Sequence, residues 1–239
     1  MTSLLKNSPD ATKIKSMFNA ISHRYDRANT ILSGGIHHLW RKKVVAWSGA
    51  SQGMNILDCA TGTGDLAIAF KKAVESEGKV IGTDFSSAML ALATEKASRK
   101  GMTIPFEEAD VLKLQYPENS FDITSIAFGI RNVADPIKGL SELARVTRPG
   151  GCVMVLEFGQ PTFPIWKECY QFYSKYLLPK LGGLITGKRD AYEYLHNSSE
   201  YFPCREKFVK LMQATTMFSS VEYRSLTGGV AWMYKGMVK

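Results

Sequence analysis

The fold of this chain is decided by the stretch Ile56-Leu57-Asp58-Cys59-Ala60-Thr61-Gly62-Thr63-Gly64-Asp65, in which an apolar strand enters a glycine-spaced turn and a helical pattern follows. Gly62 and Gly64 carry no Cβ, so the backbone can turn tightly there and approach a ligand closely. A second predicted strand comes about twenty residues later and ends in Asp84, whose carboxylate can accept both hydroxyls of a ribose. Together these features predict a nucleoside-shaped cofactor in the N-terminal half.

The identity of the nucleoside depends on Asp58. Gly62, Gly64 and Ala67 also fit the dinucleotide pattern G-x-G-x-x-G/A, which leaves a nicotinamide or flavin site open. A carboxylate is a poor neighbour for a pyrophosphate but a good one for the cationic amino group of S-adenosylmethionine. The spacing Asp-x-x-x-Gly-x-Gly, followed by Asp84, resembles the first two motifs of the Rossmann-like methyltransferases. A tight turn in any α/β protein is a further alternative, against which the matching Asp84 argues.

Composition limits the class of protein. The chain has 239 residues, of which 45% are hydrophobic, which suits one α/β domain with an additional lid. No apolar run approaches the roughly 20 residues of a membrane-spanning helix, and residues 1–10 lack the apolar core of a signal peptide. The cysteines show no Cys-x-x-Cys spacing. We therefore expect free thiols, a cytoplasmic location and no metal site.

The net charge of +8 raises the question of polyanionic partners. The basic residues are spread along the chain, without a recognisable nucleic-acid module or a lysine-rich tail, so we expect no nucleic acid partner. A solvated basic surface and contact with an anionic membrane face both remain open.

Strands and helices alternate from residue 54 to 157, as in a parallel sheet. The predicted strands are 55–59, 79–84, 104–108, 121–128 and 152–157. The predicted helices between them are 65–75, 88–100 and 137–146, with Ser86 or Ser87 as a cap. Residues 221–235 are typical of an antiparallel hairpin at the sheet edge. Such an edge could pair with a second subunit, which makes a homodimer a further hypothesis.

Two regions fall outside this alternation. Residues 12–49 are expected to be helical, with Ile14, Phe18, Ile21 and Tyr25 at helical spacing. Residues 163–202 are rich in aromatic side chains, which most often form ordinary core, although tyrosines also suit a wall that meets both apolar and polar groups. We therefore divide a single domain of residues 1–239 into four parts: a helical lid (1–49), a cofactor-binding core (50–160), an aromatic-rich cap (161–205), and a C-terminal helix and hairpin (206–239).

Longer signatures make a resemblance specific. One is Tyr25-Asp26-x-x-Asn29-x-x-Leu32-Ser33-x-x-x-His37-x-x-Trp40, with Ala28 where methionine is usual. Another is Arg145-Val146-Thr147-Arg148-Pro149-Gly150-Gly151 through Leu156-Glu157, with differences at Thr147, Arg148 and Gly159. From about Phe18 to Lys239 the chain resembles the quinone-ring C-methyltransferases of ubiquinone and menaquinone biosynthesis.

The resemblance implies a fold and a reaction. The fold is a Rossmann-like class I methyltransferase: a mostly parallel seven-stranded sheet with a C-terminal antiparallel hairpin and a helical cap. The cofactor is S-adenosyl-L-methionine, and its methyl group goes to a ring carbon of a prenylated quinol. Demethylmenaquinol is the first candidate, and the benzoquinol of the ubiquinone pathway, or both, is the alternative. Since the sulfonium carbon is already electrophilic, the protein must mainly align the reactants and exclude water.

The resemblance also supplies cofactor residues. Thr63 and Asp84 match the family, and Asp110-Val111 matches the pair that reads the adenine amino group. Asp110 alone could equally be a helix cap. With the residues of the glycine turn, the predicted cofactor set is Asp58, Gly62, Thr63, Gly64, Asp84, Asp110 and Val111.

The predicted acceptor site lies at the carboxyl edge of the sheet, where Arg131 and Asn132 follow the fourth strand. Arg131 could stabilise a phenolate and Asn132 could hold a ring oxygen. Alternatively, Arg131 pairs with Asp135 or Glu157 and only shapes the loop. His37, with an ordinary pKa of about 6.5, is a candidate base, although a lone histidine in a helical segment is more often structural. The lid residues expected to contact the acceptor are Tyr25, Asp26, Asn29 and Trp40.

Other functions remain as alternatives. One is a methyltransferase for another phenol or a sterol-like lipid, against which the signature from Tyr25 to Trp40 argues. Another is a non-catalytic methyltransferase-fold subunit of a quinone-synthesis complex. The intact glycine turn and Asp84 argue against it, because a chain without activity would be free to lose them. A nicotinamide oxidoreductase is the third. A hydrophobic acceptor also favours peripheral contact with the inner face of an anionic membrane, through basic residues and the cap.

Overall fold

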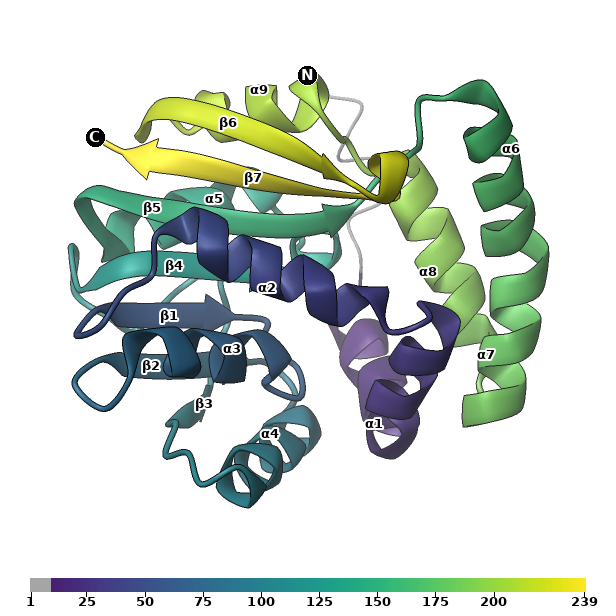
Figure 1. Ribbon diagram of the computed structural model, residues 1–239, viewed down its shortest axis with the longest axis horizontal. Coiled ribbons are helices and arrows are strands. Elements are labelled where there is room, and N and C mark those ends of the chain that lie inside the picture. The colour runs from purple at the N-terminus through teal and green to yellow at the C-terminus, as the bar shows by residue number, and fades with distance from the viewer. Residues whose placement is uncertain (1–9) are drawn as a thin grey trace.

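The computed structural model describes residues 10–239, and within them seven strands form one sheet (Figure 1). The strands are β1 (Asn55–Cys59), β2 (Lys79–Asp84), β3 (Phe106–Glu108), β4 (Phe121–Ala127), β5 (Thr147–Phe158), β6 (Phe218–Leu226) and β7 (Ala231–Val238). Their order is β3-β2-β1-β4-β5-β7-β6. Neighbours among β1–β5 pair in parallel, and β7 is antiparallel to both β5 and β6. The predicted sheet with its C-terminal hairpin is confirmed. The prediction of no signal peptide in residues 1–10 lies, except for Asp10, outside the described residues.

The helices are α1 (Ala11–Leu32), α2 (Ile36–Ser48), α3 (Asp65–Val74), α4 (Ser87–Arg99), α5 (Pro136–Val146), α6 (Pro164–Phe172), α7 (Leu178–Thr186), α8 (Arg189–Tyr201) and α9 (Glu206–Ala214). Short turns of other helix types are η1 (Ile130–Asn132), η2 (Tyr173–Leu177) and η3 (Thr227–Gly229). None of the helices in the described part of the chain is long and apolar enough to cross a membrane.

Helices cover both faces of the sheet because side chains alternate along each strand. The consecutive residues Ile56 and Leu57 belong to different core clusters. Ile56 packs with side chains of α2 and α3, whereas Leu57 packs with side chains of α5 and α9. The central strands are buried on both faces, as expected for parallel strands between two helical layers.

Local signals set most element boundaries. The hydroxyl of Ser86 accepts the N–H of Met89 at 3.2 Å and caps α4, and Asp135 caps α5 by accepting the N–H of Lys138 at 3.0 Å. The prediction that β5 begins at Cys152 was wrong, since it begins at Thr147. Thr147 pairs with Phe121 of β4, and the register then shifts before Cys152 pairs with Ile123. A tertiary pairing thus extends the strand over residues 147–151, which include Pro149, Gly150 and Gly151 and were not predicted to be part of it.

The lid and the cap pack against each other beyond the carboxyl ends of the parallel strands (Figure 1). Their shared cluster holds Ile21 and Ala28 of α1 with Ala191 and Tyr192 of α8. Ala28 is fully buried there, so the larger methionine usual at this position would require its neighbours to move. The hydroxyl of Tyr173 in η2 also donates to the backbone oxygen of Leu32 at 2.6 Å.

Gly82 offers a test of how the outer strand packs. A Cβ at this position would lie 2.6 Å from two atoms of the Phe106 ring on β3. We expect Gly82→Ala to lower the free energy of unfolding by about 1–3 kcal/mol, because the core would be overpacked. Urea denaturation measures this. Phe106→Leu should recover part of the loss in the double variant; strictly additive losses would contradict the contact.

Candidate active site

The glycine turn between β1 and α3 is held in a left-handed backbone conformation. The φ angle is 57° at Gly62 and 81° at Gly64, a region that residues with a Cβ enter at a cost. A Cβ on Gly64 would also lie 3.0 Å from the Phe106 ring and 3.1 Å from Ala93. Backbone conformation and space both require glycine at Gly64, so the turn keeps the close path that the sequence predicted.

Asp84 ends β2 beside this turn and lines a cavity of about 200 Å³. Its carboxylate accepts the N–H of Gly62 at 2.9 Å and the N–H of Ser86 at 2.9 Å. Burial raises the pKa of Asp84, and these N–H donors oppose the rise. One carboxylate thus joins the glycine turn to the start of α4 and faces a cavity whose walls include the apolar Met89 and Val111.

Asp58 has a different place from the one predicted. It is fully buried, and it is not among the residues that line the cavity. Its two carboxylate oxygens accept the hydroxyls of Thr61 and Ser125, each at 2.6 Å. Burial raises the pKa of Asp58 to about 6, although both hydroxyls oppose the rise. Asp58 therefore braces the turn against β4 instead of facing a cofactor directly.

The other predicted cofactor residues divide into two groups. Gly62, Asp110 and Val111 line the cavity, whereas Thr63 and Gly64 do not. Asp110 also accepts the N–H of Leu112 at 2.9 Å, but this contact belongs to a turn, since no helix begins there, so the alternative of a helix cap is not what the structure shows.

A charged cluster ties the lid to the glycine turn. The Thr63 hydroxyl donates to Asp26 of α1 at 2.5 Å and accepts from the Lys96 ammonium at 2.8 Å. Lys96 also pairs with Asp26 and, at 2.9 Å, with Asp65. Asp26 lines neither this cavity nor its neighbour. The structure therefore places Asp26 with the turn and not, as the sequence suggested, with residues that contact an acceptor.

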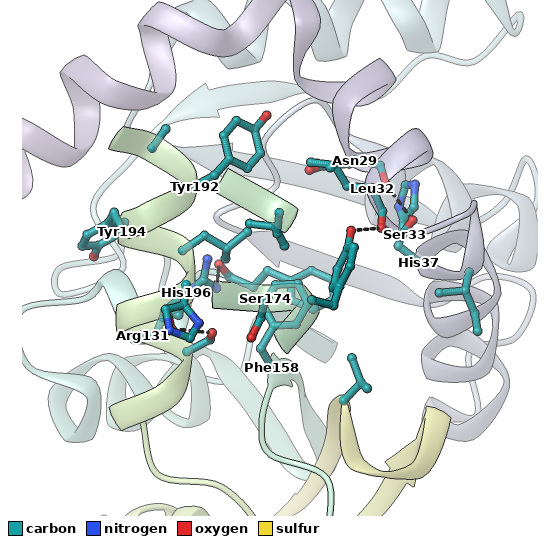
Figure 2. A pocket seen from close by; sticks show the side chains of 18 of the residues that line it. Asn29, Leu32, Ser33, His37, Arg131, Phe158, Ser174, Tyr192, Tyr194 and His196 are labelled. Atoms are coloured by element: carbon teal, nitrogen blue, oxygen red, sulfur yellow. Dashed lines mark hydrogen bonds between the residues drawn. The ribbon is translucent and has the colours of Figure 1, made fainter. Parts of the chain in front are cut away.

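A second cavity has a volume of about 260 Å³ (Figure 2). Phe18, Tyr25 and Phe128 line both cavities. Phe128 and Ala60 are non-glycine residues with positive φ, 57° and 49°. Such strained positions cost about 1–3 kcal/mol each and cluster at functional sites. Here Phe128 stands where the two cavities meet.

Arg131 lines the second cavity and is held by a buried ion pair. Its guanidinium lies 2.7 Å from the Glu157 carboxylate, and the exposed fractions of the two side chains are 5% and 2%. It also donates to the backbone oxygen of Phe128 at 2.6 Å and stacks 5.5 Å from the Phe158 ring centroid. The pairing with Glu157, one of the two alternatives, is therefore present, while Asp135 caps α5. The ion pair fixes Arg131 at the cavity wall (Figure 2).

Asn132 connects the two cavities. It lines the first, and its side-chain oxygen accepts the hydroxyl of Tyr194, which lines the second, at 2.9 Å. Burial raises the pKa of Tyr194, while the Arg131 guanidinium opposes the rise. Arg131, Asn132 and Tyr194 thus form a polar group at the junction of two mainly apolar spaces.

His37 is a weak base in this structure. Burial, and after it the positive charge of the Arg41 guanidinium that donates to its Nδ1, lower its pKa to about 4. His37, His38 and Asp65 hold ligand-type atoms within 4.8 Å of one another. Arg41 lies among them, 3.9 Å from Asp65, and its positive charge opposes a metal cation there. The histidine predicted as a base is therefore neutral at pH 7 and lines the wall of the second cavity.

Three more predicted lid residues also line the second cavity: Tyr25, Asn29 and Trp40. Trp40 donates from its indole nitrogen to the Thr227 hydroxyl at 3.0 Å. Burial raises the pKa of Tyr25, so its hydroxyl stays protonated.

Comparison with known protein families identifies the kind of protein that holds these two cavities. The family model described as the ubiE/COQ5 methyltransferase family matches residues 6–238. This chain belongs to that family. The enzyme is therefore a methyltransferase that uses S-adenosylmethionine.

Relatives and solved structures agree with the family. The chain is 58% identical to the ubiquinone/menaquinone biosynthesis C-methyltransferase UbiE of Bdellovibrio bacteriovorus, covering 98% of this chain and 99% of that protein. It is 40% identical to the demethylmenaquinone methyltransferase of Staphylococcus aureus, covering 96% and 95%. A Thermotoga maritima methyltransferase structure, described as a possible histamine N-methyltransferase, aligns with a TM-score of 0.66 at 17% identity, covering 94% and 99%. The last likeness shows the shared class I fold.

The first cavity fits the cofactor of this family. Its lining combines the Asp84 carboxylate, the open backbone at Gly62, and the apolar Val111 and Met89, which are the kinds of group that suit a ribose and a base. Several residues of the second cavity were not predicted from the sequence, among them Ser174, His196, Ser199 and Thr227. Tyr192, His196 and Ser199 recur at helical spacing, so the periodicity of α8 could have found two of them. Thr227 carries no such signal.

Asp58 generates a pH-dependent test. A carboxylate whose folded pKa is raised from 3.8 to about 6 binds its proton more tightly when folded. Its contribution to stability is therefore present at low pH and is lost as pH rises through this range. The unfolding free energy of Asp58→Asn minus that of the wild type should increase as pH rises from 3.8 to about 6 and then level. Urea denaturation across this range measures it, with the exposed Glu118→Gln as control; a constant difference would contradict the burial argument.

Proposed function

We propose that this enzyme transfers the methyl group of S-adenosylmethionine to a ring carbon of a prenylated quinol, with demethylmenaquinol as acceptor. The observation that carries the proposal is the junction of the two cavities at Phe18, Tyr25 and Phe128. One cavity offers a carboxylate and an open glycine backbone, and the other offers an aromatic wall with a few polar groups. A nucleoside cofactor and an apolar ring fit these two spaces in reach of each other.

The residues of the first cavity suit the cofactor. In this proposal Asp84 accepts the ribose hydroxyls, Asp110 and Val111 contact the adenine, and Gly62 gives the chain a close approach. Asp58, Thr63 and Gly64 act indirectly, because they hold the turn. S-adenosylmethionine supplies an electrophilic methyl group when it is bound.

Arg131, Asn132 and Tyr194 act on the acceptor. The ring carbon next to the acceptor hydroxyl becomes a stronger nucleophile when that hydroxyl loses its proton. The Arg131 guanidinium stabilises the resulting phenolate, so the hydroxyl ionises without a strong base. S-adenosylmethionine would supply the methyl group to this carbon and leave as S-adenosylhomocysteine. The ring proton would then restore the acceptor hydroxyl, so that one proton is released overall. Asn132 and Tyr194 orient a ring oxygen, and the aromatic wall excludes water.

His37 takes a positioning role in this proposal and not that of a base. A group with a pKa of about 4 is unprotonated at pH 7 but attracts a proton weakly. Its place beside Arg41 and Thr30 suits the shaping of the wall that Asn29 and Trp40 continue.

The ubiquinone-pathway benzoquinol is the second candidate acceptor. The name of the Bdellovibrio protein supports it, because that name covers both ubiquinone and menaquinone. The name of the Staphylococcus protein refers to demethylmenaquinone alone. We also propose that the enzyme works in the cytoplasm, in peripheral contact with the membrane that holds the acceptor. A homodimer through the outer strand β6 stays a prediction.

A methyl-transfer assay tests the proposed function. Purified enzyme and S-adenosylmethionine are mixed under reducing conditions with demethylmenaquinol or, separately, with the unmethylated benzoquinol. The products are identified by mass spectrometry. We expect a gain of one methyl on demethylmenaquinol. A gain on both acceptors would assign both pathways. No gain on either, with cofactor binding verified by calorimetry, would overturn the proposal.

Arg131 gives a sharper prediction. Removing it alone would leave the Glu157 carboxylate buried without its ion-pair partner, which typically costs about 3–5 kcal/mol of stability. The informative variant is therefore Arg131→Met combined with Glu157→Gln, which removes both charges. We expect turnover to fall about 100-fold. Cofactor affinity should be unchanged, because Arg131 lines only the second cavity.

The matched control is Arg189→Met with Glu193→Gln, which removes an exposed ion pair on α8. It should leave turnover intact. Full turnover in the Arg131 and Glu157 double variant would remove Arg131 from the mechanism, and a loss of cofactor binding would point to a collapsed junction.

A further inference from the structure

Exposed apolar side chains are concentrated on one segment of this enzyme. Among the residues that the structure describes, eleven large hydrophobic side chains are exposed, and eight of them lie between residues 163 and 184. Six of these define what we call the cap face: Phe163, Ile165, Phe172, Tyr176, Leu181 and Leu184, with exposed fractions from 43% to 83%. Apolar residues scattered singly on a surface are ordinary, but a cluster of this kind marks an interaction site.

The segment that carries the cap face is an outer layer. α6, η2 and α7 follow one another along the right-hand edge of Figure 1, with α8 and α1 on their inner side. No side chain of α6 is buried. The helix contacts the rest of the chain through partly buried side chains such as Tyr170, and it leaves the apolar Ile165 and Phe172 exposed.

Charge on the same segment indicates the kind of partner. From Phe163 to Lys188 the chain holds the exposed Lys167, Lys175, Lys180 and Lys188, and its single acidic residue is Glu168. Lysine stems can lie along apolar surface while their ammonium groups reach outward, and Lys175 does so over the Tyr176 ring at 5.4 Å. Apolar and aromatic side chains bordered by lysines complement the interface of an anionic bilayer.

The inner side of the same segment lines the second cavity. Trp166, Tyr170, Tyr173, Ser174 and Leu178 belong to that wall. Trp166 is also 40% exposed and donates from its indole nitrogen to the backbone oxygen of Thr227 at 3.0 Å. The same helical layer thus lines the cavity with some of its side chains and exposes apolar and lysine side chains elsewhere on its surface.

We propose that the cap face docks on an anionic lipid bilayer, with its apolar side chains inserted at the level of the headgroups. The assignment rests on the proposed function, because a prenylated acceptor resides in such a bilayer. A docked cap layer lets the acceptor ring enter the second cavity while its tail stays in lipid. Insertion of the cap face is then needed for methylation of long-tailed acceptors and is not needed for short-tailed ones.

Vesicle sedimentation tests the surface. Wild-type enzyme should sediment with vesicles of phosphatidylglycerol and phosphatidylcholine and much less with phosphatidylcholine alone. Ile165→Ser with Leu184→Ser should lower vesicle partitioning about tenfold, since two apolar side chains no longer leave water. Leu39→Ser, an exposed leucine on α2 outside the cap face, is the apolar control. Lys167→Glu with Lys180→Glu should also lose binding, and Lys207→Glu with Lys210→Glu on α9 is its charge-matched control.

Methyl transfer to a short-tailed acceptor in solution separates this proposal from the proposed function. The cap-face variants should keep that activity while losing turnover of a long-tailed acceptor in vesicles. Wild-type enzyme that methylates the acceptor but ignores anionic vesicles would overturn the docking surface alone. Equal losses in the control variants would overturn it too. So would a lipid-free dimer, seen by sedimentation velocity, that the cap-face substitutions dissociate, because the occupant would then be a second copy of the chain.

Discussion

Two aspartates at the ends of neighbouring parallel strands hold the glycine turn in place. Asp84 receives backbone N–H groups from the turn and from the start of α4, and Asp58 receives hydroxyls from the turn and from β4. Both carboxylates are buried, and a buried carboxylate needs hydrogen-bond donors. The donors that stabilise each carboxylate are therefore held in position by it. The first cavity exists because these contacts fix the turn at the carboxyl edge, and the second cavity begins at the next strand end.

Several energetically unfavourable features lie where the two cavities meet. Phe128 and Ala60 take positive φ angles, and a Cβ on Gly129 would lie 2.5 Å from that of Ala60. The charge of Arg131 is buried and needs Glu157 beside it. Many other contacts in the surrounding sheet must hold these strained and charged residues in place. The guanidinium and the neighbouring amide are thereby held at the cavity wall, and in the proposed mechanism this lowers the reorganisation that catalysis would otherwise require.

The lid links both cavities to the turn. Side chains of α1 line each cavity, and Asp26 of the same helix contacts Thr63 in the turn and Lys96 on α4. In the proposed function, the helix that lines the cofactor cavity is therefore also the one that lines the acceptor cavity. Its packing against α7 and α8 extends this connection to the cap.

The sequence by itself determined the sheet, the glycine turn and the position of Asp84, because strand alternation and glycine conformation are local properties of the chain. It also named Arg131 and Asn132 through their place at a strand end and through a family resemblance. Only the tertiary structure decided how these groups are used. Asp58 turned out to be enclosed by Thr61 and Ser125, Asp26 to contact the turn, and His37 to be a weak base. These outcomes depend on burial and on partners such as Arg41 and Lys96, which come from other elements and which no local pattern specifies. The start of β5 was mispredicted for the same reason, since the pairing of Thr147 with Phe121 is a tertiary contact.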